Sequence, residues 1–95
     1  MNLEQVRRRR EEIERVSRRY GARDVRIFGS VARGDDSPDS DLDVLVKFEA
    51  GRSLLDLVGI QQDLEELLGC RVDVVSEGGI SPHLEGRILA DAVPL

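Results

Sequence analysis

A glycine–serine pair, Gly29-Ser30, followed ten residues later by a strand pattern holding two carboxylates, Asp41 and Asp43, constrains the fold of this chain most. In segment 41–48 every second position is apolar, at Leu42, Val44, Val46 and Phe48, which places these four residues on one face of a strand and both carboxylates on the other. Carboxylates are costly to bury, so a pair of them on a strand indicates a site rather than a wall of the core. The sequence therefore predicts a strand that carries a polar site on one face and core on the other.

The composition describes one small domain. The chain has 95 residues, of which 40% are hydrophobic, enough for one modest core, and we expect residues 1–95 to form a single domain. No apolar run has the length of a membrane span, and the Arg- and Glu-rich start does not resemble a secretory signal. The single cysteine, Cys70, cannot form an internal disulfide, which favours a reducing, cytoplasmic location.

Charge is unevenly distributed along the chain. The first 20 residues contain seven arginines and four glutamates, a net charge of +3, whereas the remainder carries −8. Acidic bulk repels phosphate backbones, so we expect no direct binding of nucleic acids. Arginines and glutamates four residues apart, at 7 and 11, 8 and 12, and 10 and 14, are expected to pair along a solvated helix face; a patch for a triphosphate or an acidic partner is the alternative.

Hydrophobic periodicity predicts the order of the elements. We expect a helix over 3–20, a strand over 24–28, a short helix over 31–33 capped by Ser30, a strand over 41–48, a helix over 54–68, a strand over 71–76 and a last helix from 81 to about 90. Gly21 and Gly69 are placed to end two of these helices. Ser53 and Asp56 form a capping box at the start of the helix over 54–68.

Segment 41–76 has the order and length of a right-handed crossover unit, strand–helix–strand, which makes its two strands parallel. In the second strand Asp73 stands between two valines, so its side chain points to the opposite face from theirs. We therefore expect an α/β (α+β) fold, in which helices flank a small mixed β-sheet.

Asp41, Asp43 and Asp73 can form one metal site. The Cα atoms of Asp41 and Asp43 lie roughly 6.6 Å apart, since a strand rises about 3.3 Å per residue, and Asp73 can join from the adjacent strand. Three converging carboxylates repel one another and raise their pKa values, whereas Mg²⁺ accepts such oxygens as ligands. Two such ions can stabilise the attacking and the leaving oxygen of an in-line displacement.

The glycine–serine turn suits phosphate. Gly29 allows close approach to the backbone, and Ser30 adds a hydroxyl at the start of a helix, where anions are favoured. Arg33, one turn further on, can brace an aspartate or contact phosphate. These residues predict a nucleotide site beside the carboxylates.

Three segments, 29–34 (GSVARG), 40–44 (SDLDV) and 72–74 (VDV), resemble the minimal nucleotidyltransferases of the DNA polymerase β superfamily. The resemblance extends over nearly the whole chain and implies a polymerase β-like core. For the individual residues it implies Gly29 and Ser30 on the triphosphate, Asp41 and Asp43 on two Mg²⁺ ions, and Asp73 completing the nucleophile-side metal.

Many proteins of this family are antitoxins paired with a HEPN-domain RNase toxin, and some transfer AMP from ATP to a toxin tyrosine. The resemblance thus implies ATP as substrate, a HEPN toxin as partner and a hetero-oligomer. Two other functions stay open: a module that neutralises its partner sterically, and a small-molecule transferase of the aminoglycoside-modifying kind. The complete carboxylate set favours catalysis, and the small size of the domain disfavours an enclosed acceptor site.

Overall fold

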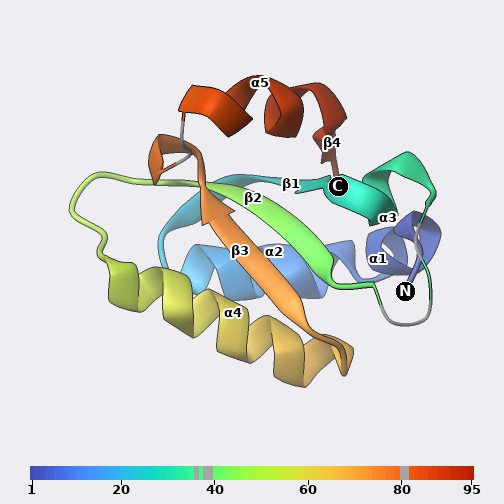
Figure 1. The fold of residues 1–95 in the computed structure, drawn as a ribbon. Helices are drawn as coiled ribbons and strands as arrows, with labels where there is room; N and C mark the ends of the chain where they lie inside the picture. The colour runs from blue at the N-terminus through green and yellow to red at the C-terminus, as the bar shows by residue number, and fades with distance from the viewer. Residues whose placement is uncertain (36, 38–39, 80–81) are drawn as a thin grey trace.

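The computed structural model describes residues 1–35, 37, 40–79 and 82–95 (Figure 1). Its elements are α1 (Leu3–Arg8), α2 (Arg10–Arg19), β1 (Ala22–Phe28), α3 (Gly29–Arg33), β2 (Leu42–Phe48), α4 (Leu54–Leu68), β3 (Val72–Ser76), η1 (Glu77–Gly79), α5 (Pro82–Asp91) and β4 (Val93–Pro94). None of the described helices is long and apolar enough to cross a membrane.

The four strands form one mixed sheet in the order β3-β2-β1-β4. β2 pairs in parallel with β3 and antiparallel with β1, and β4 pairs antiparallel with the other edge of β1. The predicted mixed sheet and the parallel pairing of the two carboxylate strands are confirmed. Crossover helix α4 lies on one face of the sheet between β2 and β3.

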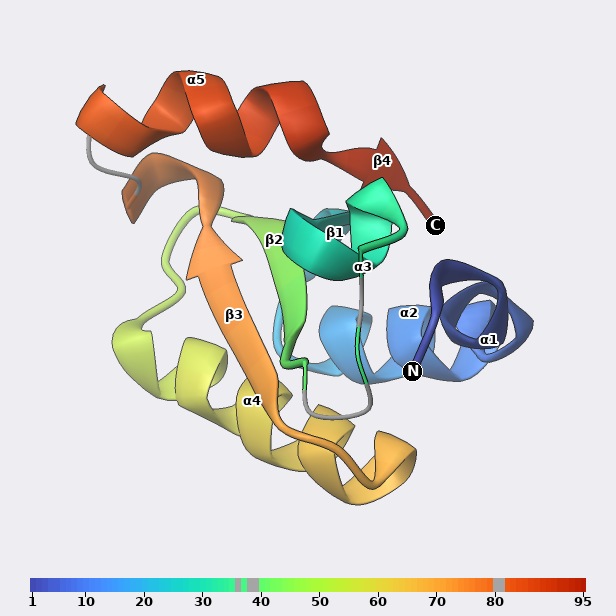
Figure 2. The same cartoon turned by 45° about the vertical axis from the view of Figure 1, so that its right-hand side comes forward.

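The core lies between the sheet and the helices α1, α2 and α4. Its fully buried members come from every layer: Val6, Ile13, Ile27, Val44, Val46, Ile60 and Leu64. Figures 1 and 2 both show α2 and α4 on this side of the sheet and α5 on the opposite side. The apolar positions of β2 that alternate with its carboxylates thus pack into the core, as predicted.

The helix predicted over 3–20 is wrong in one respect, because it is broken at Arg9. This residue has φ −101° and ψ 16°, and it separates α1 from α2. The apolar stripe has no member between Val6 and Ile13, and the Arg9 side chain instead pairs with Glu12 at 2.8 Å and donates to the carbonyl oxygen of Leu67 at 3.3 Å. The hydrogen bond from Arg9 to Leu67 in α4 thus favours the break.

The break also changes the ion pairs of the helix face. The predicted pairs at 7 and 11, 8 and 12, and 10 and 14 are absent from the described residues. Three different pairs form in their place: Arg8 with Glu4, Arg9 with Glu12 and Arg18 with Glu14.

The remaining boundaries agree within two residues. β1 begins at Ala22, two residues before the predicted start, and it contains a bulge between Arg23 and Arg26 where Asp24 has φ +52°. The capping box of α4 is confirmed, with Ser53 N donating to Asp56 Oδ2 at 2.9 Å. The predicted start of the last helix, residue 81, lies outside the described residues.

Candidate active site

The turn after β1 and the carboxylates of β2 lie in contact. Gly29 follows the last residue of β1 with φ +75°, and a Cβ at this position would overlap the Asp43 carboxylate, with Oδ2 as its nearest atom. In the β1–β2 pairing Phe28 stands opposite Asp43, which is why the turn meets that side chain. Only glycine combines this backbone conformation with this close approach without strain.

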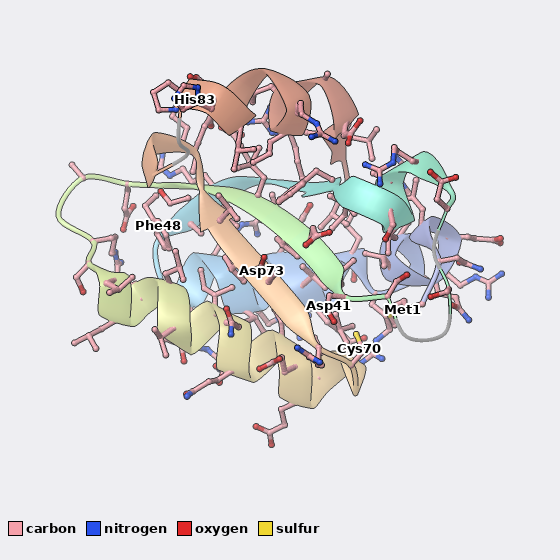
Figure 3. All side chains as sticks on the ribbon, in the orientation of Figure 1. Met1, Asp41, Phe48, Cys70, Asp73 and His83 are labelled. Carbon is pink, nitrogen blue, oxygen red and sulfur yellow. The ribbon has the colours of Figure 1, made fainter. Side chains whose placement is uncertain are left out.

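Parallel pairing brings the third carboxylate to the same place. Asp43 and Asp73 are partners in the register of β2 and β3, so both side chains point to the same face of the sheet. Asp41 stands two residues before Asp43, and its Oδ1 lies 3.6 Å from Nε of Arg71. Figure 3 shows Asp41 just before β2 and Asp73 on the neighbouring strand.

The electrostatics of Asp43 report this convergence. Partial burial, the neighbouring carboxylate of Asp73 and then that of Asp41 raise the pKa of Asp43 from 3.8 to about 6, while the Arg33 guanidinium lowers it. A raised carboxyl pKa of this origin means that the folded site disfavours negative charge unless a cation joins it. The donor set therefore fits a hard divalent cation, which prefers carboxylate oxygens.

The carboxylates do not form a closed ligand cage. Across residues 1–35, 37, 40–79 and 82–95, no three His, Cys, Asp or Glu side chains are arranged to hold a metal ion as they stand. Asp73 is exposed and Asp41 is half-exposed, so surrounding side chains do not fix the orientation of either carboxylate by packing. A site of this kind leaves ligand positions open for water and phosphate.

The sequence predicts that Ser30 caps the short helix, and this prediction is wrong. α3 begins at Gly29, its N-cap residue is Phe28, and no side chain caps it. The Ser30 carbonyl oxygen accepts a hydrogen bond from the backbone N–H of Asp35 at 2.9 Å. Because no side chain caps α3, the hydroxyl of Ser30 is not required for the helix, and Ser30 follows directly after Gly29, which contacts Asp43.

Arg33 braces two aspartates, the first of the two uses that the sequence suggested for it. Its Nη1 donates to Oδ2 of Asp91 at 2.6 Å, and its Nε donates to Oδ2 of Asp35 at 3.2 Å. These hydrogen bonds, first that of Asp91, raise the pKa of Arg33. The sequence analysis missed Asp91, which lies 58 residues away and has no local motif.

A groove elsewhere on the described surface is not part of this site. It has a volume of about 710 Å³ and lies between α2, the start of β1 and the end of the chain. Four of its charged residues form two ion pairs, Arg18 with Glu14 and Arg23 with Glu49. None of the candidate site residues lines it.

A turn with a positive-φ glycine beside carboxylates from two neighbouring strands fits a protein that acts on metal-bound phosphate esters. Family comparison makes this specific: the nucleotidyltransferase domain model matches residues 9–95. The chain belongs to this family, whose members generally use divalent metal ions. The expected nucleotidyltransferase enzyme is confirmed.

Two curated relatives are protein adenylyltransferases by name. A candidate protein adenylyltransferase of Methanocaldococcus jannaschii is 43% identical over 93 residues, which cover 98% of this chain and 97% of the relative. The protein adenylyltransferase MntA of Thermococcus cleftensis is 40% identical over 75 residues, covering 79% of this chain and 76% of that protein.

Solved structures agree on the fold. A structure described as a candidate minimal nucleotidyltransferase has a TM-score of 0.88 and 54% identity, and the match covers 100% of this chain and 97% of the other. The expected polymerase β-like fold is thereby confirmed. The MNT antitoxin–HEPN toxin complex of Shewanella oneidensis, whose toxin is tri-AMPylated, gives a TM-score of 0.68 at 19% identity, over 88% of this chain and 66% of the other.

Proposed function

We propose that this chain transfers AMP from ATP to a hydroxyl group of a partner protein, with Asp41, Asp43 and Asp73 as its catalytic carboxylates. The observation that carries the proposal is the contact between Gly29 and Asp43, because it unites the turn and the carboxylate strands in one site. The names of the two curated relatives support a protein as the acceptor and AMP as the transferred group.

In this proposal the triphosphate of ATP lies along the turn. The backbone at Gly29 approaches the phosphates closely, the Ser30 hydroxyl donates a hydrogen bond to a phosphate oxygen, and the Arg33 guanidinium offsets negative charge. The proximity of Arg33 to the site is supported by its effect on the pKa of Asp43. Together these residues hold the α-phosphorus over the start of β2, where Asp43 lies.

The carboxylates supply the ligands and the base. Asp41 and Asp43 would hold two Mg²⁺ ions, and Asp73 would complete the site of the ion on the nucleophile side. The chemistry that two bound Mg²⁺ ions would supply here is neutralisation of phosphate charge and stabilisation of the attacking and leaving oxygens. The acceptor oxygen forms a bond to the α-phosphorus, the bond from that phosphorus to the pyrophosphate oxygen breaks, and Asp73 takes the hydroxyl proton.

We propose a HEPN-domain toxin as the partner, in a hetero-oligomer. The small domain, resembling antitoxins that act on their toxins, supports an acceptor provided by another chain, and the AMPylated Shewanella oneidensis complex shows that a chain of this fold can sit beside such a toxin. A cytoplasmic location belongs to the same proposal, since Cys70 is a free thiol that suits a reducing compartment.

Mass spectrometry of the intact partner tests the proposal. The product of the adjacent gene is purified and incubated with ATP, Mg²⁺ and either wild type or the double variant Asp41→Asn/Asp43→Asn. A matched control, Glu66→Gln, removes an exposed carboxylate of α4 that makes no ion pair within the described residues. We expect an AMP adduct with wild type and with Glu66→Gln and none with the double variant.

Two outcomes would replace the proposal with an alternative. If the partner stays unmodified and is neutralised equally by wild type and the double variant, the chain is a steric binding module. If no partner is modified but pyrophosphate is released when aminoglycosides or other small alcohols are added, the chain is a small-molecule transferase.

A further inference from the structure

Arg33 links the site to the last helix of the chain. Its two hydrogen bonds, from Nη1 to Asp91 and from Nε to Asp35, use two of the three nitrogens of the planar guanidinium. Neither of them uses Nη2, the third group of the guanidinium. The bond to Asp91 is the shorter, at 2.6 Å against 3.2 Å, and Asp91 has the less exposed side chain of the two carboxylates, 30% against 70%.

Asp91 is the last residue of α5, a helix that packs only loosely on the rest of the fold. No residue of this helix is buried, and Leu84 and Leu89 remain 49% and 38% exposed. Its main contacts with other helices and strands are with α3 and β1, and Figure 2 shows its C-terminal half above α3. The Arg33–Asp91 ion pair therefore ties the end of α5 to the helix that begins at Gly29.

We propose that Asp91 is a positioning residue of the nucleotide site. It holds Arg33 beside the start of β2, where Asp43 lies, so that Nη2 can donate to a phosphate oxygen of ATP. This inference rests on the proposed function, because it requires a nucleotide at the turn. A guanidinium that is already held through two of its nitrogens loses less conformational freedom when the third nitrogen binds phosphate. Asp91 thus acts through Arg33 and does not itself contact ATP.

A competing role for Asp91 predicts the opposite sign. An aspartate that merely occupied Arg33 in the absence of ligand would have to be displaced by phosphate, and its removal would strengthen ATP binding. A purely structural ion pair would leave ATP affinity unchanged in the folded protein. Titration of ATP therefore separates the three roles.

Calorimetric titration with ATP and Mg²⁺ is performed on wild type, Asp91→Asn, Arg33→Ala and the double variant Arg33→Ala/Asp91→Asn. We expect Asp91→Asn to weaken ATP binding roughly tenfold, within the range found for side chains coupled in one network. The double variant should bind no more weakly than Arg33→Ala alone, because Asp91 acts only through Arg33. In turnover, KM for ATP should rise more than kcat falls.

Two further variants serve as controls. Glu85→Gln removes another exposed carboxylate of α5, one that forms no ion pair within the described residues, and should bind ATP like wild type. Asp91→Glu keeps the charge and should recover part of the lost affinity, and it replaces Asp91→Asn if circular dichroism shows that variant to be unfolded.

Each outcome has a definite meaning. If wild type itself does not bind ATP, the proposed function fails and this inference fails with it. If wild type binds ATP but Asp91→Asn binds equally well or more tightly, or if the two substitutions weaken binding additively, the positioning role is wrong while the proposed function stands.

Discussion

The two faces of the sheet are built from alternate residues of the same strands, and the two faces have different roles. The face that packs against α2 and α4 is apolar, and its β2 residues Leu42, Val44 and Val46 are fully buried. The other face carries Asp43 and Asp73 at one end and is covered by α5, a helix without a buried residue. One face holds the domain together, so the other can keep charges that would weaken a core.

The contrast extends to the helices. α4 is closed at its start by a capping box and at its end by Gly69 in the left-handed conformation, and it buries Ile60 and Leu64. α5 buries none of its residues, and its final residue is bonded to Arg33. Substitutions on the two faces should therefore separate stability from chemistry.

The largest effect is expected for Asp43→Asn. Losing a ligand oxygen in the transition state costs several kcal/mol, which corresponds to about a thousandfold in kcat/KM for AMP transfer. Urea unfolding should give a free energy no lower than that of wild type, since the amide removes a partly buried charge. A loss of less than tenfold in the transfer assay would mean that Asp43 is not a metal ligand.

On the opposite face, Leu64→Ala should lower the free energy of unfolding by about 3 kcal/mol, because the leucine is fully buried and leaves a cavity. Leu55→Ala in the same helix is the control: Leu55 is 81% exposed, and its truncation should change stability by less than about 0.5 kcal/mol. Below the melting temperature both variants should keep the wild-type rate of AMP transfer. A rate loss in Leu64→Ala greater than its unfolded fraction explains would contradict the separation of the two faces.

Gly29→Ala and Gly34→Ala form a matched pair. Both glycines have positive φ, +75° and +80°, so each alanine should cost about 1 kcal/mol of stability. Only the new Cβ at position 29 meets the Asp43 carboxylate, whereas position 34 has no atom within 4 Å. We expect roughly a hundredfold loss of transfer rate for Gly29→Ala alone, since misplacing a catalytic group by about 1 Å can cost that much. Equal losses in the two variants would make the effect one of backbone strain.

A smaller loss is expected for Ser30→Ala. A hydrogen bond from its hydroxyl to a charged phosphate oxygen is worth about 1.5–3 kcal/mol, or roughly 10- to 100-fold in kcat/KM. Because Ser30 does not cap α3, thermal unfolding should be unchanged. A greater loss of rate in Ser30→Ala than in Asp43→Asn would reverse the roles given to the two residues.

The smallest effect concerns pH. The folded pKa of Asp43, about 6, lies above its ordinary value of 3.8, so the folded protein retains a proton that the unfolded chain releases. Without metal, the destabilisation by Asp43 should be absent below pH 4, grow between pH 4 and 6, and be complete above pH 6. Solvent screening at this half-exposed group limits it to about 1 kcal/mol or less.

The measurement compares unfolding by urea in EDTA for wild type and Asp43→Asn. Asp43→Asn should gain stability relative to wild type at pH 7 and show no gain at pH 4. Adding Mg²⁺ should stabilise wild type at pH 7 and leave the variant unaffected. A gain that is the same at both pH values would show that the carboxyl does not titrate in this window.

The sequence by itself determined the features that depend on local patterns. Alternation in segment 41–48 determined which residues of β2 face the core, and Ser53, Asp56 and Gly69 determined where α4 begins and ends. The length of segment 41–76 was enough to predict that the strands bearing Asp43 and Asp73 run parallel. These features follow from side-chain periodicity and from capping within a few residues, which a sequence displays directly.

Tertiary structure decided what depends on contacts between distant residues. The break at Arg9 goes with its hydrogen bond to Leu67, and β4 exists because Val93 and Pro94 find the free edge of β1. The pKa of Asp43 and the bond from Arg33 to Asp91 likewise depend on residues brought together from remote parts of the chain. Burial and charge proximity are properties of the folded arrangement in three dimensions, so no local period in the sequence can encode them.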